Sequence, residues 1–164
     1  MSRRSTKCYK PTMPPAEIID KIINAGLYAA NGRNWQSPII VAVTDKAMRD
    51  RIAKLNAAVM GADIDPFYGA PAVLIVLADK SKPTYVYDGS LAMGNMMLAA
   101  HALDLGSCWI HRAKEVFESE EGKEILRSLG IEGDYEGIGN LIIGYPDGQP
   151  RAVAERLPNR VYKI

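Results

Sequence analysis

The sequence contains few of the residues that build disulfide frameworks or metal sites. Its two cysteines, Cys8 and Cys108, lie far apart in the chain and in no Cys-x-x-Cys pair. Its two histidines, His101 and His111, offer few further ligands. Neither a disulfide framework nor a metal site is therefore indicated, and we expect both cysteines to be free thiols.

The sequence also lacks an excess of charge and a long apolar run. Its 20 Lys and Arg are balanced by 19 Asp and Glu, so the net charge of +1 provides no overall field to attract nucleic acid or an anionic membrane. The longest apolar run, from Ala70 to Ala78, is far shorter than the roughly 18–20 residues that span a bilayer. The basic amino terminus is followed by PTMPPAEIID and not by an unbroken apolar stretch, so it does not resemble a signal peptide. We expect a cytoplasmic protein with no membrane or nucleic-acid partner.

Common motifs of nucleotide-binding and hydrolytic sites are missing. There is no GxGxxG after a predicted strand, no GxxxxGKS/T, no HExxH and no GxSxG. No side chain is therefore an obvious nucleophile. His101 lies in an Ala-rich helical segment and is interpreted as a structural histidine, whereas the role of His111, after a predicted strand, is more open.

Turn-forming residues divide the 164-residue chain into alternating helical and strand-like segments. Apolar periodicity predicts helices over 16–29, 90–104 and 114–129, the last as one helix or a pair. It predicts one further helix, which Thr44 or Asp45 caps and which ends at Gly61. Short apolar runs predict strands over 39–43, 72–78, 107–110 and 139–145, before an irregular basic tail over 146–164. The length is typical of one domain of roughly 100–200 residues, so we predict a single layered domain over 1–164.

Two polar clusters are candidates for ligand binding. RRSTK at 3–7 combines three cations with two hydroxyls, which suits a phosphate group, although a solvated basic terminus is an equally good interpretation of these residues alone. The loop NGRNWQSP at 31–38 carries amide groups that can bind the edge of a heterocycle or simply form a polar turn.

Several motifs along nearly the whole chain resemble the FMN-dependent nitroreductase family. RRSTKCY resembles its opening Arg-x-Ser-x-Arg/Lys-x-aromatic segment, and NGRNWQSP resembles its Asn-x-Gln-Pro-Trp loop. GAP at 69–71, NMMLAAHALDLGSCWI at 95–110, GNLIIGYP at 139–146 and RLPNRVYKI at 156–164 follow in the family's order. The chain departs from the Gln-Pro-Trp pattern, because Gln36 is followed by Ser37-Pro38 and the tryptophan, Trp35, precedes it. The chain also lacks the longer insertions that form a lid in larger members.

The resemblance implies a role in FMN binding for twelve residues. Arg3, Arg4 and Ser5 would bind the phosphate and ribityl chain, which Arg156 would also reach from the tail. Lys7 would lie at the pyrimidine side of the isoalloxazine and raise its reduction potential. The positions that would contact the ring are the loop residues Asn31, Gly32, Asn34 and Gln36 of the partner subunit and the strand-end residues Trp109, Ile110 and His111.

The same resemblance implies the fold class, the assembly and the reaction. We expect an α+β fold, a three-layer α-β-α sandwich with a central mixed sheet flanked by helices, in a domain-swapped homodimer with FMN at the subunit interface. NADH or NADPH would pass a hydride to flavin N5, and a nitroaromatic, quinone or similar acceptor would then take the electrons by a ping-pong mechanism. The alternatives are a non-enzymatic dimeric flavin-binding protein, or a flavoenzyme of the same fold that carries out flavin fragmentation or reductive dehalogenation.

Overall fold

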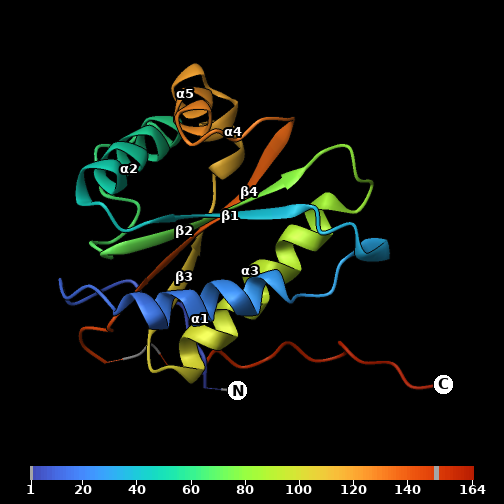
Figure 1. The fold of residues 1–164 in the computed structure, drawn as a ribbon. Helices are drawn as coiled ribbons and strands as arrows, with labels where there is room; N and C mark the ends of the chain where they lie inside the picture. The colour runs from blue at the N-terminus through green and yellow to red at the C-terminus, as the bar shows by residue number, and fades with distance from the viewer. Residues whose placement is uncertain (1, 150–151) are drawn as a thin grey trace.

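The computed structural model describes residues 2–149 and 152–164, which form a four-stranded sheet between two layers of helices (Figure 1). The helices are α1 (Ala16–Leu27), α2 (Lys46–Met60), α3 (Tyr85–Ala102), α4 (Ala113–Glu118) and α5 (Glu120–Ser128), with a 3-10 turn η1 (Gly32–Asn34). The strands are β1 (Pro38–Val43), β2 (Ala72–Asp79), β3 (Gly106–Ile110) and β4 (Tyr135–Gly144).

The sheet has the strand order β1-β2-β4-β3, and each neighbouring pair is antiparallel. Within the described part of the chain, parallel pairing is restricted to an isolated bridge between Ser5 and Ser107, so the four strands there form an antiparallel sheet and not the mixed sheet that was predicted. The physical reason is that the amino-terminal segment adds one parallel contact to β3 without forming a strand of its own.

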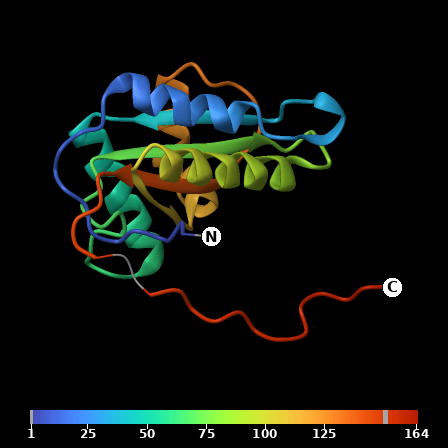
Figure 2. The ribbon, with the colours of Figure 1, turned by 90° about the horizontal axis from the view of Figure 1, so that it is seen from below.

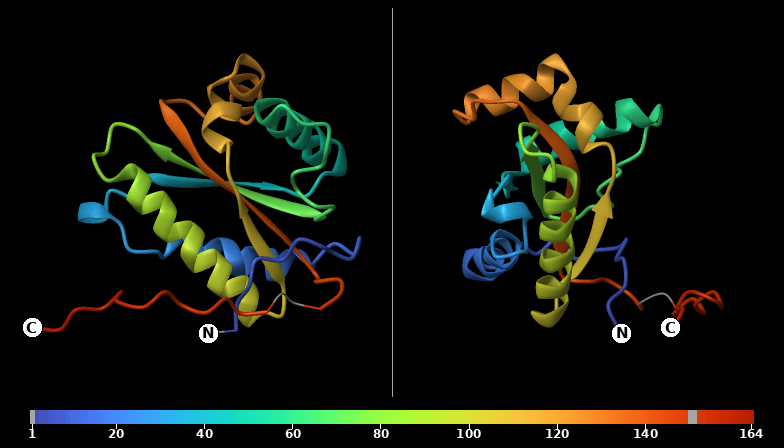
Figure 3. Two further views of the ribbon diagram at one scale, coloured as in Figure 1. Left: turned by 180° about the vertical axis from the view of Figure 1, so that it is seen from behind. Right: turned by 90° about the vertical axis from the view of Figure 1, so that its right-hand side faces the viewer.

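Both faces of the sheet are covered, which explains the unbroken apolar run of β2. Val73, Ile75 and Leu77 pack toward α2, α4 and α5, whereas Leu74 and Val76 pack toward α1 and α3. Figure 1 shows α1 and α3 below the sheet and the other helices above it, and the views in Figures 2 and 3 show the same layers from below, from behind and from the side. The predicted three-layer α-β-α sandwich is therefore confirmed.

Local sequence signals set the ends of α2. The Asp45 side chain accepts a hydrogen bond from the Met48 amide as an amino-terminal cap, and Gly61 ends the helix in the left-handed conformation at φ 68°. The predicted helix over 114–129 is a pair, because Ser119 is extended and its side chain caps α5 at the Gly122 amide.

The bounds of α3 differ from the sequence prediction at both ends. The helix begins at Tyr85, five residues before the predicted start, and Asp88 lies buried inside its first turn, because tertiary partners satisfy its carboxylate. It ends at Ala102, two residues before the predicted end, since Asp104 takes the left-handed conformation (φ 59°), and Gly106 is the first residue of β3. No helix in residues 2–149 or 152–164 is long and apolar enough to cross a membrane.

Candidate functional site

The amino-terminal segment lies against β3 and the chain that follows β4. The Thr6 amide donates to the Ser107 carbonyl at 3.0 Å, and the Asp147 amide donates to the Cys8 carbonyl at 3.0 Å. A Cβ atom on Gly106 would lie 2.6 Å from the Thr6 hydroxyl oxygen, so this close approach requires glycine. The basic segment is thus fixed to the sheet beside β3.

Residues 2–8, the loop after α3 and residues 146–149 enclose a pocket of about 520 Å³, here called the amino-terminal pocket. Arg3, Arg4, Ser5 and Lys7 all line it, which brings these four predicted site residues together. Asp104 and Asp147 line it as well, but in the described part of the chain neither carboxylate forms an ion pair with Arg3.

Two buried polar atoms at the amino-terminal pocket have no hydrogen-bond partner among the described residues. They are Arg3 Nη1 and Ser107 Oγ. Burial of an unsatisfied donor costs about 1–3 kcal/mol, and more for a charged group, so such atoms indicate a missing partner. A phosphate group suits both, since it accepts charge-assisted hydrogen bonds from guanidinium and further bonds from a hydroxyl.

His101 also lines this pocket, where it had been interpreted as a structural histidine. Its ring is exposed, and Nε2 lies 2.7 Å from the Ser2 hydroxyl. The signal that could have found it is its position in the last turn of α3, directly before the strand that carries the site.

A second pocket of about 190 Å³, here called the strand-end pocket, lies where β3 ends. Trp109, Ile110 and His111 line it together with Lys7, so the two pockets adjoin through the Lys7 side chain. Lys7 Nζ also lies 5.1 Å from the centroid of the Tyr68 ring, a cation–π contact to the loop over 61–71. Seven of the twelve predicted residues therefore lie around two adjoining pockets.

The turn after β3 is held by buried amides that the sequence analysis missed. Asn56 of α2 donates to the His111 carbonyl at 2.8 Å and accepts from Arg112 Nε at 3.0 Å. Asn140 of β4 donates at 3.4 Å to the Ile110 and His111 carbonyls. Both asparagines are fully buried, and Arg112 has a left-handed backbone with φ 73°. The sequence signal for them is an asparagine in an otherwise apolar face.

The loop over 31–36 is strained and held by a buried carboxylate. Arg33, Asn34 and Gln36 all have positive φ, at 48°, 56° and 50°. Asp88 accepts from the Gly32 amide at 2.9 Å and from the Ser37 hydroxyl at 2.8 Å, which ties the loop to α3. Non-glycine residues in this region cost of order 1–3 kcal/mol each and persist where the surroundings enforce them, often at functional sites.

This loop does not meet the two pockets within one chain. Asn31, Gly32, Asn34 and Gln36 line neither pocket, and Figures 1 and 2 show η1 at the opposite end of the molecule from residues 2–8. Arg156 lies on the exposed tail over 152–164 and likewise lines neither pocket. One chain thus brings together seven of the predicted residues and leaves five apart.

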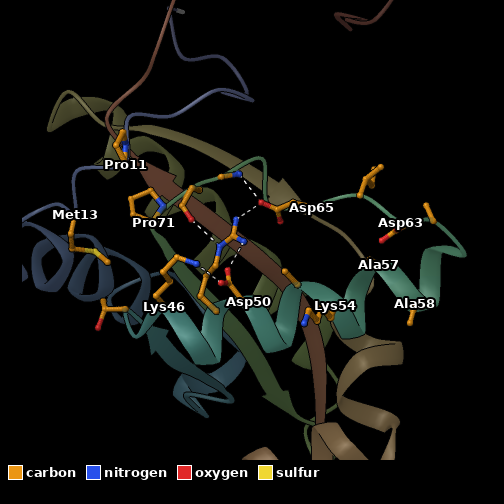
Figure 4. Close-up of a pocket in the computed structure, with 17 residues that line it drawn as sticks. Pro11, Met13, Lys46, Asp50, Lys54, Ala57, Ala58, Asp63, Asp65 and Pro71 are labelled. Carbon is orange, nitrogen blue, oxygen red and sulfur yellow. Dashed lines mark hydrogen bonds and ion pairs between the residues drawn. The ribbon is translucent and has the colours of Figure 1, made fainter.

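A further cavity, of about 930 Å³, lies elsewhere, between α2, the loop over 61–71 and residues 11–13, and is here called the α2 pocket. Figure 4 shows hydrogen bonds and ion pairs reaching Asp50 and Asp65 inside it. The Arg49 guanidinium donates hydrogen bonds to the Ala70 carbonyl and to these two carboxylates, at 2.6–3.1 Å. No buried side-chain nitrogen or oxygen of the described α2 pocket residues lacks a hydrogen-bond partner, so these groups do not call for a ligand.

Asp65 has a lowered pKa in this network. Burial alone would raise the pKa of its carboxyl group, but hydrogen bonds from Arg49 and from the Gly69 and Phe67 amides outweigh burial and hold the pKa below its ordinary value. The carboxylate therefore serves as the fixed acceptor that shapes the loop over 61–71.

Comparison with known sequences identifies relatives over most of the chain. The model of the nitroreductase family matches residues 1–66 and 59–145. A protein of Methanothermobacter thermautotrophicus named as an NADH dehydrogenase/NAD(P)H nitroreductase is 30% identical, over 98% of this chain and 82% of its own length. A protein of the same name from Archaeoglobus fulgidus is 31% identical, over 88% of this chain and 82% of its own length.

Solved structures resemble the fold closely. A nitroreductase from Bacteroides fragilis with bound FMN has a TM-score of 0.90 at 24% identity, covering 99% of this chain and 95% of that one. An FMN-dependent nitroreductase from Clostridium difficile has a TM-score of 0.78 at 27% identity, covering 94% and 89%. Iodotyrosine deiodinase with bound FMN and 3-iodo-L-tyrosine has a TM-score of 0.76 at 21% identity, covering 98% and 94%, which is a likeness of fold alone.

Proposed function

The chain belongs to the nitroreductase family, and from this premise we propose that it is an FMN-dependent NAD(P)H oxidoreductase that reduces a nitroaromatic, quinone or similar acceptor. The single observation that carries the proposal is the pair of buried polar atoms, Arg3 Nη1 and Ser107 Oγ, which have no partner among the described residues in a pocket that Lys7 also lines. FMN, when bound, supplies the hydride and electron transfer, for which no side-chain nucleophile is needed.

Arg3, Arg4 and Ser5 are proposed to hold the phosphate in the amino-terminal pocket. Two guanidinium groups match the roughly two charges of a phosphate monoester, and charge-assisted hydrogen bonds are the strong kind. The unpartnered Ser107 hydroxyl adds a donor from the floor of the same pocket. The donors of the amino-terminal pocket thus fit the cofactor's anionic end.

Lys7, Trp109, Ile110 and His111 are proposed to surround the isoalloxazine at the strand-end pocket. The Lys7 ammonium would stabilise the negative charge that accumulates when the ring is reduced, and this favours the reduced form. Asn56 and Asn140 fix the backbone from Ile110 to His111, so its polar groups are presented without reorganisation. NADH or NADPH and the acceptor would use the open side of the ring in turn, in a ping-pong mechanism.

A homodimer is proposed to complete the site, because one chain leaves five predicted residues apart. The outer side of α3 exposes Tyr87, Leu91 and Leu98, and the tail over 152–164 exposes Leu157, Val161 and Tyr162. Exposed apolar groups gathered on one helix and one extended arm fit a partner surface. A second copy would bring its strained loop to the pockets of the first, and the exchanged tail would bring Arg156 to the phosphate.

The absorbance spectrum of the purified protein tests the proposal, recorded anaerobically before and after addition of NADH and then NADPH. We expect a flavin spectrum that bleaches with at least one nucleotide and recovers when the acceptor is added. A flavin spectrum that never bleaches would support the non-enzymatic binder instead. A colourless protein that FMN does not reconstitute would contradict the proposed cofactor.

A further inference from the structure

The loop over 61–71 has a strained backbone where it lines the strand-end pocket. Tyr68 lines this pocket and has a positive φ of 52°. Gly69 follows it, also with a positive φ, at 70°. A tyrosine in this region has an energetic cost and persists where its surroundings enforce it, often at a functional site. The neighbours of Tyr68 must therefore hold it in this conformation.

Asp65 holds Tyr68 from within the same loop. Its carboxylate accepts hydrogen bonds from the amides on either side of Tyr68, those of Phe67 at 2.9 Å and Gly69 at 2.8 Å. The Tyr68 amide donates to the Asp65 carbonyl at 3.2 Å. Arg49 of α2 in turn donates to the Asp65 carboxylate at 2.6 Å (Figure 4). The backbone is thus fixed directly before and directly after Tyr68.

The two neighbouring aromatic side chains of the loop lie beside different cations. Phe67 is fully buried, and the Arg49 guanidinium lies 5.4 Å from its ring centroid. Tyr68 is 37% exposed, and Lys7 Nζ lies 5.1 Å from its ring centroid. A cation over an aromatic face is attracted by the quadrupole of the ring. The strained residue therefore presents its ring to the lysine that lines both candidate cofactor pockets.

The contact with Tyr68 is the interaction that restricts the Lys7 side chain. Among the described residues, Lys7 forms no ion pair and no side-chain hydrogen bond. A lysine ammonium on its flexible four-carbon stem takes many positions when nothing holds it. Because a charge acts more strongly at shorter distance, its effect on a bound isoalloxazine depends on where the side chain is held.

We propose that Tyr68 is a positioning residue that holds the Lys7 ammonium at the isoalloxazine and so raises the reduction potential of the bound flavin. The proposal deepens the function proposed above and rests on it. A charge that is already in place needs no reorganisation when negative charge develops beside it. The hydrogen bonds between Arg49 and Asp65 then serve the site as well as the fold, because they fix the loop that carries the Tyr68 ring.

Potentiometric titration of the FMN-loaded protein tests the proposal in a double-mutant cycle. Tyr68→Leu is expected to lower the two-electron potential, in the same direction as Lys7→Ala. In the Tyr68→Leu background, the shift caused by Lys7→Ala is expected to be at most about half as large as in the wild type, since the ammonium is no longer held there. Tyr68→Phe keeps the aromatic face and is expected to keep the wild-type potential.

Two further variants separate this effect from damage to the fold. Tyr68→Asn removes the ring but tolerates the left-handed backbone, so it takes the place of Tyr68→Leu if that variant does not fold. Tyr28→Leu is the matched control, because Tyr28 is an exposed tyrosine at the end of α1 and lines neither pocket. This control is expected to leave the potential unchanged.

Nuclear magnetic resonance of the apoprotein tests the contact without flavin. The ring current of Tyr68 should shift the Lys7 side-chain protons upfield, and Tyr68→Phe should keep this shift whereas Tyr68→Leu removes it. An absent ring-current shift, or effects of Tyr68→Leu and Lys7→Ala on the potential that simply add, overturns this inference alone. A potential as low in Tyr68→Phe as in Tyr68→Leu also overturns it, in favour of a role for the hydroxyl. A protein that holds no flavin overturns the proposed function and this inference together.

Discussion

The α2 pocket and the amino-terminal pocket differ in size and in how far their polar groups are satisfied. The α2 pocket is the larger, at about 930 Å³ against about 520 Å³. Its arginine, Arg49, is hydrogen-bonded through three nitrogens, whereas Arg3 keeps a buried nitrogen that has no partner in residues 2–149 and 152–164. Unsatisfied chemistry, rather than volume, therefore identifies the pocket that awaits a ligand.

The two arginines also show how one residue type serves two purposes. Arg49 is buried between α2 and the loop over 61–71, where it joins the Ala70 carbonyl to Asp65 and its guanidinium lies 5.4 Å from the centroid of the Phe67 ring. Its neighbours consume its donors, so it stabilises the fold. Arg3 lies on a segment outside the helices and strands, and the fold leaves its charge available. Substitution of each arginine in turn tests whether Arg49 stabilises the fold and Arg3 binds the cofactor.

Arg49→Ala is expected to have the largest effect, on stability and not on cofactor binding. The change removes three hydrogen bonds, leaves the buried Ala70 carbonyl without this donor and takes the ion-pair partner from Asp65, which keeps only its two amide donors; we expect the loss to cost about 3 kcal/mol. Urea unfolding measures this loss, and flavin content per folded molecule should stay at the wild-type value. Loss of flavin from a fully folded variant would show that the α2 pocket takes part in the site.

Arg3→Ala is expected to weaken FMN binding with little effect on the free energy of unfolding of the apoprotein. Removal of a charge-assisted phosphate contact costs about 1.5–3 kcal/mol, a rise in Kd of roughly 10–100-fold. Flavin titration of the apoprotein gives the Kd, and Lys10→Ala is the control, an exposed cation nearby that does not line the pocket. Unchanged flavin affinity would contradict the proposal that Arg3 binds the FMN phosphate.

Asp65→Asn tests the satisfied network through pH. The folded pKa of Asp65 lies below its ordinary value, so its carboxylate adds stability above the unfolded pKa of about 3.9 and loses that contribution as the pH falls through the folded pKa. Because the side chain is 37% exposed, solvent screens part of the effect, and we expect a loss of about 1 kcal/mol at pH 7. Urea unfolding at pH 7 and pH 3 should show this difference shrinking in acid, and a difference independent of pH would contradict the assigned network.

Most of the fold could be predicted from the sequence because its signals are local. Asp45 and Gly61 mark the ends of α2, and the apolar run of β2 indicates a strand covered on both faces. The start of α3 could not be predicted, because Asp88 is satisfied by Gly32 and Ser37, residues more than 50 positions away. Asp88 therefore acts as a tertiary anchor for the start of α3.

The candidate site could be predicted only where the family motifs lie. The amino-terminal cations and the end of β3 meet, as the resemblance implied, although their roles in cofactor binding stay predictions. Asn56, Asn140 and Arg112 were missed because each lies in a different element, and only the fold brings them to one turn. The separation of the loop over 31–36 from the pockets was also invisible, since linear order gives no distance between the two ends of a domain.

Lys7→Ala gives the smallest expected effect and the sharpest comparison with Arg3. Lys7 lies between the two candidate cofactor pockets and contacts Tyr68 instead of a carboxylate, so its charge is free to act on the ring rather than on the phosphate. Loss of one partly solvated charge worth about 1 kcal/mol should lower the two-electron potential by roughly 20 mV and leave the Kd for oxidised FMN within about threefold. Potentiometric titration of both variants decides the matter. If Arg3→Ala shifts the potential and Lys7→Ala shifts only affinity, the ring lies in the amino-terminal pocket and the phosphate in the strand-end pocket, the reverse of the proposed arrangement.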